Sequence, residues 1–500
     1  MQSVKILLVI TAIWVQTPFA AHAANEAMAS NSPAVTDNKL DSKQVDLLKL
    51  ERDVFLSPSA DLDKIEYQTA KLLQVNSSSH WANYLMSSVL LRLYLREPSE
   101  VSLLRQSTSL AAQTYELDPT SELGYVALAN ILEVNGESDK GLLLLAEAKN
   151  KGLKFSWRFD FVKARLLAGD ETQSKILDLY RSALEDPSAI RSLIAPYVLA
   201  TFGTNTQSIP SSSAVKEWST EFPCYEFSMA YANSLLNEGK IDQALAALEA
   251  ADRIDPSRGE GLYFRALVSY VNLKDSKQAA ALLSQIKSKK LPESILGDYT
   301  MLKAKTSLML DPKTLPSALL AEAVRKANDR DVGVQEISNV LVDQKRFADL
   351  ASFLETIHTE VPGIAKSYGI SGDLLLSIQN KPDIAIRQYT NAILLDQGNP
   401  MYFNGRGQAL YKLSKFDLAR ADFEMSMQLD PTDSSARYNL ACMLALTSRE
   451  KEALEILASA IEIDRKLIDK ARQDDDFRFI KNGSGFKKIL NTKTEEIVAH

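Results

Sequence analysis

The chain has 500 residues, 45% hydrophobic and 24% charged, so it is long enough for several domains or an elongated array and is not disordered as a whole. Its formal net charge of −7 and its sequence pI near 5.5 argue against a nucleic-acid binder or a polybasic membrane binder. With only 19 glycines and 17 prolines, the composition favours long helices over a turn-rich β architecture.

The first 23 residues have the pattern of an export signal. Lys5 supplies a positive start, residues 6–15 form a short apolar run, and residues 21–23 form the small-x-small cleavage pattern. A run of about ten residues is too short for a bilayer, which takes about 20. We therefore expect cleavage after Ala23 and a periplasmic or secreted protein without a transmembrane segment. An uncleaved membrane anchor is the alternative.

Residues 24–39, rich in Ala, Ser and Asn, are expected to form a flexible leader, and residues 40–203 an N-terminal helical array. A closing motif then recurs at intervals of 68 and 69 residues: Leu117-Asp118-Pro119, Glu185-Asp186-Pro187 and Ile254-Asp255-Pro256. These intervals are about twice the 34-residue length of a helix-turn-helix repeat. The regular acidic residue and proline therefore predict stacked helix pairs.

Residues 204–223 are polar, turn-prone and repeat-free, and we expect them to link this array to a second one over residues 224–467. The second array contains the cleanest unit, residues 400–433. Gly407 and Ala419 stand where its two helices approach closely, Phe423 fills the space between them, and Pro431 ends the unit. The preceding and following units repeat this plan, although Gly372 of the preceding one falls one position early, which predicts a small loop adjustment.

On these residues the chain resembles the tetratricopeptide repeat (TPR) family, in an exported bacterial form. The resemblance implies an all-α fold: a right-handed α-solenoid of stacked antiparallel helix pairs, here in two arrays. Residues 468–500 are similar to the acidic-then-aromatic tails that close many bacterial TPR proteins. We expect Asp474, Asp475 and Asp476 to form a solvated acidic cap at the exposed end of the last repeat.

The first helix of each unit should line a concave groove that holds an extended or helical peptide. Its candidate residues mix amides, tyrosines and apolar side chains, any of which could instead only touch a neighbouring helix. They are Asn404, Gln408, Tyr411, Lys412, Tyr438 and Cys442 in the last units, and Met229, Asn233 and Asn237 in the middle ones. TPR domains that clamp chaperone carboxylate ends use Lys, Asn and Arg, and Gly405 and Ala230 replace them at two such positions here, so we do not expect a chaperone clamp.

Other chemistry has little support in the sequence. Beyond the export signal only His80, His358 and His500 remain, none at metal-ligand spacing from another His or Cys, so we expect no metal and no cofactor. Cys224 and Cys442 are far apart in sequence, and we expect two unpaired thiols.

The sequence therefore predicts an exported scaffold or adaptor that binds protein or peptide partners and is not an enzyme. Support of an envelope assembly is a specialised form of this hypothesis, and nucleic acid is not an expected partner. One alternative is a glycan-active all-helical toroid, which would need two carboxylates about 5–10 Å apart. Another is a spacer without a specific ligand.

Overall fold

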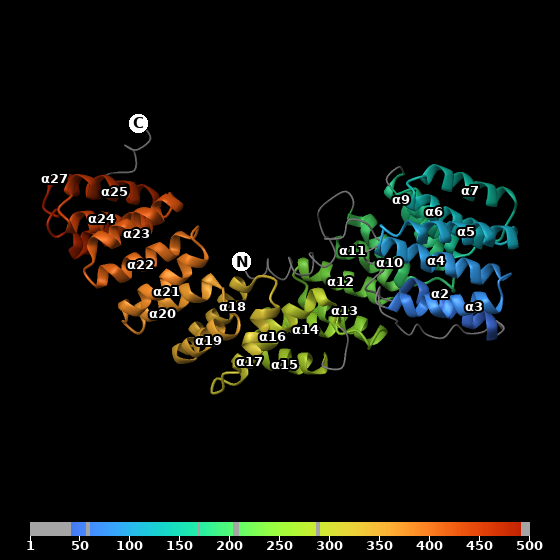
Figure 1. Cartoon of the computed structure of the whole chain (residues 1–500), viewed down its shortest axis with the longest axis horizontal. Helices are drawn as coiled ribbons and strands as arrows, with labels where there is room; N and C mark the ends of the chain where they lie inside the picture. Colours follow the sequence, from blue (N-terminus) through green and yellow to red (C-terminus); the bar gives the residue numbers. More distant parts are fainter. Residues whose placement is uncertain (1–41, 57–60, 169–170, 204–209, 287–290, 492–500) are drawn as a thin grey trace. The chain divides into compact units, whose positions relative to one another are not determined.

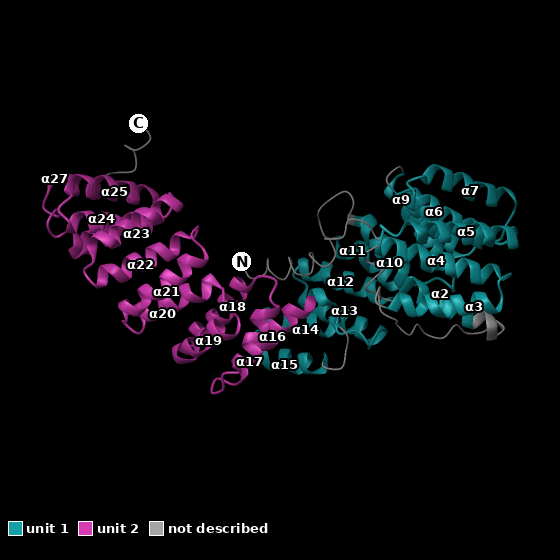
Figure 2. Cartoon of the chain, viewed as in Figure 1, with its two compact units in different colours: residues 1–294 teal, residues 295–500 magenta. Residues whose placement is uncertain are grey.

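The computed structural model describes residues 42–56, 61–168, 171–203, 210–286 and 291–491, and these residues form helices and no β-strand. The expected export signal and leader lie outside the described residues. Among the residues that are described, no helix is both long and apolar enough to cross a bilayer. The chain divides into two compact units, residues 1–294 and residues 295–500 (Figure 2).

The helices follow one another in pairs along the chain (Figure 1). Those of the first unit are α2 (Ser42–Leu56), α3 (Leu62–Val75), α4 (His80–Arg96), α5 (Val101–Leu117), α6 (Glu122–Val134), α7 (Ser138–Asn150), α8 (Trp157–Leu166), α9 (Gln173–Glu185), α10 (Arg191–Gly203), α11 (Ser212–Glu221), α12 (Tyr225–Asn237), α13 (Ile241–Ile254), α14 (Glu260–Val271) and α15 (Ser276–Gln285).

The division between the units falls in the first turn of α16. The helices of the second unit are α16 (Glu293–Leu310), α17 (Ser317–Lys326), α18 (Arg330–Asp343), α19 (Phe347–Glu360), α20 (Ala365–Ser377), α21 (Pro382–Leu395), α22 (Pro400–Lys412), α23 (Phe416–Leu429), α24 (Ser434–Leu446), α25 (Glu450–Ile463), α26 (Leu467–Gln473), the 3₁₀ turn η4 (Asp475–Phe477) and α27 (Ser484–Leu490).

The packing is that of an α-solenoid. Most helices pack on the next one along the chain, and first helices of successive pairs also touch, as α18 touches α20 and α20 touches α22. A stack of this kind places the first helices on its concave side. The predicted all-α, TPR-like fold is therefore confirmed.

The acidic residue that closes each repeat has a specific structural role. The Oδ1 atom of Asp118 accepts the backbone N–H of Thr120 at 3.0 Å, and Asp186 and Asp255 accept from the residues two positions on at 2.8 and 3.1 Å. This is an Asx turn, in which the carboxylate replaces a backbone acceptor. The turn explains why Asp precedes Pro at the ends of the units.

The turn between the two helices of a pair also repeats one backbone conformation. Lys345, Asn380, Ser414 and Ser448 have φ angles of 55, 51, 58 and 61°, in the left-handed region that ends many helices. They are 35, 34 and 34 residues apart, so the backbone repeats with the period of the sequence.

Two glycines lie at close helix contacts in the second unit. A Cβ atom added to Gly407 would lie 2.6 Å from Phe423 Cε1, and one added to Gly372 would lie 2.8 Å from Tyr389 Cε1. The loop of residues 378–381 between α20 and α21 is one residue longer than the loop of residues 413–415 between α22 and α23. The expected close approach at Gly407 and the loop adjustment beside Gly372 are both present.

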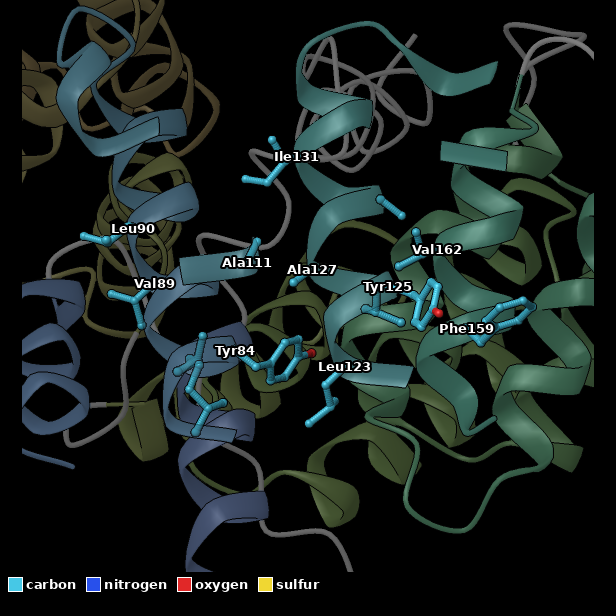
Figure 3. Packing of buried hydrophobic residues seen from close by; sticks show 14 of the residues in the cluster. Tyr84, Val89, Leu90, Ala111, Leu123, Tyr125, Ala127, Ile131, Phe159 and Val162 are labelled. Atoms are coloured by element: carbon cyan, nitrogen blue, oxygen red, sulfur yellow. The ribbon is translucent and has the colours of Figure 1, made fainter. Parts of the chain in front are cut away.

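The first unit has a continuous apolar core between its helix pairs. Tyr84 of α4, Tyr125 of α6 and Phe159 of α8 are each at most 5% exposed and belong to one cluster (Figure 3). The largest of these side chains come from first helices, so close packing between first helices holds successive pairs together.

The expected linker over residues 204–223 differs from the structure in its second half. Residues 212–221 form α11, in which Val215 and Trp218 are buried, and Phe222 at its end is buried as well. These three residues recur at helical spacing and place one apolar face against the core, although the surrounding residues are polar. The structure instead divides the units between Ser294 and Ile295.

Candidate functional site

In the first unit, part of the surface formed by first helices is covered by the chain's own α2. This helix packs on α4 and α10. Leu56 at its end belongs to the same buried cluster as Trp157 and Phe161 of α8. The helix therefore occupies the position that a helical ligand would take in a solenoid groove.

A buried ion pair fixes α2 in this position. Arg158 of α8 donates through Nε to Glu51 Oε1 at 2.6 Å, and the hydroxyl of Tyr84 donates to the same oxygen at 3.1 Å. Glu51 is 1% exposed and Arg158 is 5% exposed. A buried charge is tolerated only when it is paired and hydrogen-bonded, and the three side chains meet that condition.

In the second unit, the C-terminal segment covers α22 and α24, which are the first helices of the last two pairs. The Tyr438 hydroxyl of α24 donates to Asp474 Oδ2 at 2.7 Å, and the Tyr411 hydroxyl of α22 donates to Asp476 Oδ1 at 2.7 Å. Phe477 is fully buried beside Tyr438, with their rings edge to face. The predicted cap is present, but two of its carboxylates are bound by tyrosines rather than only solvated.

Cys442 belongs to the same cluster. Its Sγ lies 3.9 Å from Asp474 Oδ2, and burial together with Asp474 raises the pKa of the thiol. One ligand atom each from Cys442, Asp474 and Asp476 lies within 4.8 Å of the others, a spacing that a metal ion could bridge. The tyrosine hydroxyls already supply donors to both carboxylates, so the cluster is satisfied as a hydrogen-bond network. Both cysteines of the chain are free, buried thiols.

The structure thus brings Tyr411, Tyr438 and Cys442 together, but against the chain's own C-terminal segment. Burial, with the bonded carboxylates, raises the pKa of both tyrosines, so their hydroxyls remain protonated donors. Residues 474–477 lie against Tyr438 and Cys442, which are at most 3% exposed, and against Tyr411, which is half-buried. Their expected availability in an open groove is therefore corrected by the structure.

The other candidate residues are dispersed. Asn404 accepts from Asn439 Nδ2 at 2.9 Å, and Lys412 donates to the Leu376 carbonyl at 3.2 Å, so both bridge neighbouring helices. Gln408 is exposed.

In the middle units, Met229 is 7% exposed and packs in the interior, Asn233 is half-buried and Asn237 is exposed. These nine positions do not form one open site, and partner binding at those that are exposed stays a prediction.

An open cavity lies further toward the N-terminal side of the second unit. Its volume is about 420 Å³, and residues of α18, α20 and α22, all first helices, line most of it. Three apolar side chains at its rim are strongly exposed: Val342 is 44%, Ile378 is 53% and Met401 is 63% exposed. Exposed apolar groups gathered around a cavity are typical of a binding surface.

A tyrosine and two glycines shape the cavity. The Tyr389 hydroxyl of α21 donates to Asp373 Oδ1 of α20 at 2.6 Å. The ring of Tyr389 fits there because Gly372 and Gly405 lack a side chain: a Cβ atom added to Gly405 would lie 2.5 Å from Tyr389 Cε1. Gly405 therefore has a packing role, which explains why a clamp residue could not stand at its position.

The cavity has few polar side chains, and their hydrogen-bonding arrangements differ. Gln335 Nε2 of α18 donates to Asn339 Oδ1 at 2.8 Å. Ser338, next to Asn339, is 1% exposed, and its Oγ has no hydrogen-bond partner among the described residues. Asp373 is in contact with solvent, yet it lies inside a concave surface, and this partial burial raises the pKa of its carboxyl group.

Carboxylates outnumber cations around the cavity. Burial raises the pKa of Tyr402, and the nearby charges of Asp331, Asp396 and Asp373 raise it further. Lys366 is the one cation among the lining residues, and its backbone N–H donates to Asp331 at 3.3 Å. Asp373 is the single carboxylate that lines the cavity itself, so the cavity lacks the carboxylate pair that glycoside hydrolysis requires.

None of the predicted groove residues lines this cavity, although the sequence contains a signal for it. Gln335, Asn339 and Val342 belong to a degenerate repeat, and Asp373 and Ile378 belong to the next one. Extending the same first-helix positions from residues 400–467 back to these units would have found them.

Comparison with known proteins supports the repeats. Residues 215–293, 374–434 and 404–467 match the family model of the tetratricopeptide repeat. The chain is 31% identical over 80 residues to small glutamine-rich tetratricopeptide repeat-containing protein 2 of Mycosarcoma maydis, a match that spans 16% of this chain and 23% of that relative. The matched segments are therefore tetratricopeptide repeats, a class whose concave surface generally binds proteins.

Two solved structures are similar in fold. Yeast Tom70 is 14% identical, with 91% of this chain and 100% of that chain covered and a TM-score of 0.33. PilF of Pseudomonas aeruginosa is 16% identical, with 51% of this chain and 95% of that chain covered and a TM-score of 0.29.

Proposed function

We propose that this chain, whose residues 215–293 and 374–467 carry tetratricopeptide repeats, is a scaffold that binds a peptide segment of a partner protein in the cavity over α18, α20 and α22. The observation that carries the proposal is the exposed apolar rim of Val342, Ile378 and Met401 around a concave space. An amphipathic or extended segment buries such a rim through alternate side chains.

The covered surfaces support this choice of site. In the first unit α2 occupies part of the first-helix surface, and in the second unit Asp474 and Asp476 bind the tyrosines of α22 and α24. The cavity between these helices and α18 is a first-helix concavity that the described chain leaves open. At both places a segment of the chain itself occupies the surface, and these segments illustrate the kind of ligand that such surfaces accept.

The proposal includes export and a role in the cell envelope. Its support is the sequence pattern of Lys5, the apolar run of residues 6–15 and the cleavage pattern ending at Ala23. In an exported scaffold the partner would be a protein of the periplasm or of an envelope assembly. The test is N-terminal sequencing of the mature protein: a start at Ala24 in the periplasmic fraction supports export, and an intact Met1 in the cytosol excludes it.

A charged side chain at the rim tests the binding site. Ile378→Arg places a cation among the apolar groups that a partner would bury, whereas Leu394→Arg changes a residue of α21 that is 69% exposed and lies outside the cavity. Each variant and the wild type are used as bait in cell-envelope extracts. Loss of the captured protein with Ile378→Arg alone supports the proposal, and equal capture by all three baits contradicts it.

A further inference from the structure

The cavity has a polar centre as well as an apolar rim. Asp373 lines it, and within the described part of the chain the Tyr389 hydroxyl is the one donor to its carboxylate, at Oδ1. Oδ2 of Asp373 is therefore still able to accept a hydrogen bond. The exposed rim residues Ile378 and Met401 lie in the same cavity. From this arrangement, and resting on the proposed function, we infer that the partner segment inserts a lysine or arginine side chain at Asp373, next to an apolar side chain that packs on the rim.

The charge distribution favours a cation over an anion. Asp331 and Asp396 act on Tyr402 together with Asp373, while Lys366 is the one cation that lines the cavity. Lys366 forms no ion pair within 4.0 Å among those of the described residues, so it does not neutralise Asp373 directly. Asp373 would repel a ligand carboxylate, whereas a ligand cation gains a charge-assisted hydrogen bond there.

A second observation points to a ligand at the same place. Ser338 Oγ is buried, lines the cavity and has no hydrogen-bond partner among the described residues. A buried hydroxyl without a partner is costly in a folded protein. The guanidinium or ammonium group of a ligand lacks an acceptor, so this hydroxyl can accept from the inserted cation or from a backbone N–H of the segment.

The long apolar stem of Lys or Arg suits this geometry. Such side chains place methylene groups along apolar surface and keep the charge at the tip. Here the stem would lie against Ile378 and Met401, and the tip would reach Asp373 beyond them. A purely apolar segment would leave the carboxylate unpaired under it, which costs free energy.

The test is a selection of peptides on the full chain. The probe is a phage-displayed library of random nonapeptides, selected on the wild-type protein and, in parallel, on Asp373→Asn and on Asp178→Asn. Asparagine still accepts from Tyr389, so Asp373→Asn removes the charge and keeps the fold; thermal unfolding followed by circular dichroism verifies this. Asp178 is an exposed carboxylate of α9, which makes Asp178→Asn the matched charge control.

We expect peptides with Lys or Arg beside Leu, Ile, Phe or Met from the wild type and from Asp178→Asn, and loss of this basic preference with Asp373→Asn. Replacing the basic residue of a selected synthetic peptide by glutamine should weaken its binding at least tenfold on the wild type and leave its binding to Asp373→Asn unchanged. Peptides that bind in the cavity without a basic residue would overturn the inference.

Ile378→Arg separates this inference from the proposed function. Peptides whose binding is lost with Ile378→Arg but not with Asp373→Asn would retain the peptide site and exclude the basic anchor. If no selected peptide depends on Ile378, or if no peptide is selected, the proposed function fails together with the inference.

Discussion

The Tyr438 hydroxyl donates to Asp474 Oδ2 over 2.7 Å and thereby joins α24 to a segment 36 residues further along the chain. Tyr411 makes the same kind of bond to Asp476, so two tyrosines from successive first helices hold one short acidic turn. The acidic turn contacts the concave side of the stack as well as the apolar end of the last helix pair, and in this way it closes the end of the stack.

Removing one of these hydroxyls should loosen the cap. Tyr438→Phe removes the hydroxyl donor to Asp474 Oδ2, while the backbone N–H of Asp476 still donates to Oδ1 at 3.0 Å, and the lost bond to a charged group costs about 1–3 kcal/mol. The expected result is faster amide hydrogen exchange in residues 467–490. Tyr67→Phe, at a tyrosine that is 71% exposed, is the control and should change nothing. Unchanged exchange in Tyr438→Phe would show that the cap is held by its apolar contacts alone.

The contact at Gly407 predicts a cost of overpacking. Gly407→Leu places a side chain where a Cβ atom alone would lie 2.6 Å from the Phe423 ring, and it should destabilise the second unit by about 1–3 kcal/mol. Gly398→Leu is the control, because a Cβ atom there would have Asp396 Oδ1 at 3.5 Å as its one close neighbour. Hydrogen exchange of α22 and α23 measures the effect; equal protection in both variants would contradict the packing described here.

The period of the sequence predicted the helix pairs, their turns and the Gly407 contact, because these depend on residues within one repeat. Residues 474–477 could not be placed on Tyr438 and Tyr411 from the sequence, since that contact depends on the path of the chain through α25 and α26. The cavity could not be predicted for the same reason, because a first-helix surface is open only where no distant segment of the chain covers it. The predicted groove residues lie on first helices, their role in binding stays a prediction, and their coverage required the coordinates.

The pair of Glu51 and Arg158 predicts that α2 is essential to the first unit. Glu51→Ala removes the main carboxylate partner of the buried Arg158 and leaves it Glu122 at 3.5 Å, so the change should cost up to about 3–5 kcal/mol. Trp81, Trp157 and Trp218 all lie in this unit, so urea unfolding followed by tryptophan fluorescence reports on it. Asp63→Asn breaks the exposed pair with Arg96, in which Asp63 is 72% exposed, and should change stability little. Similar midpoints for the two variants would refute the role of α2.

The environment of Asp373 predicts a dependence of stability on pH. Burial raises the pKa of this carboxyl group, although Tyr389 and Lys366 oppose the shift; Tyr402 of α22 and the uncharged Gln335 and Asn339 of α18 complete its surroundings. The folded chain therefore keeps a proton that the unfolded chain has lost, and this contribution to stability disappears as the pH rises above about 4 through the raised pKa.

Asp373→Asn cannot ionise, so the variant should gain stability relative to the wild type as the pH rises over this window. Thermal unfolding of both proteins at about pH 4 and about pH 7 measures the difference. If the difference in stability between the two proteins is equal at both pH values, the carboxyl group has the same pKa in the folded and the unfolded chain.

Site-specific photo-crosslinking in the native cell tests the scaffold account most directly. A benzoylphenylalanine residue replaces Met401, which is 63% exposed in the cavity, or Leu394, which is 69% exposed on α21 outside it. A partner bound in the cavity should give a discrete protein adduct at position 401 that disappears with Ile378→Arg, and no such adduct at position 394. Adducts of the same kind and amount at both positions, or a discrete adduct at position 394 alone, would contradict it.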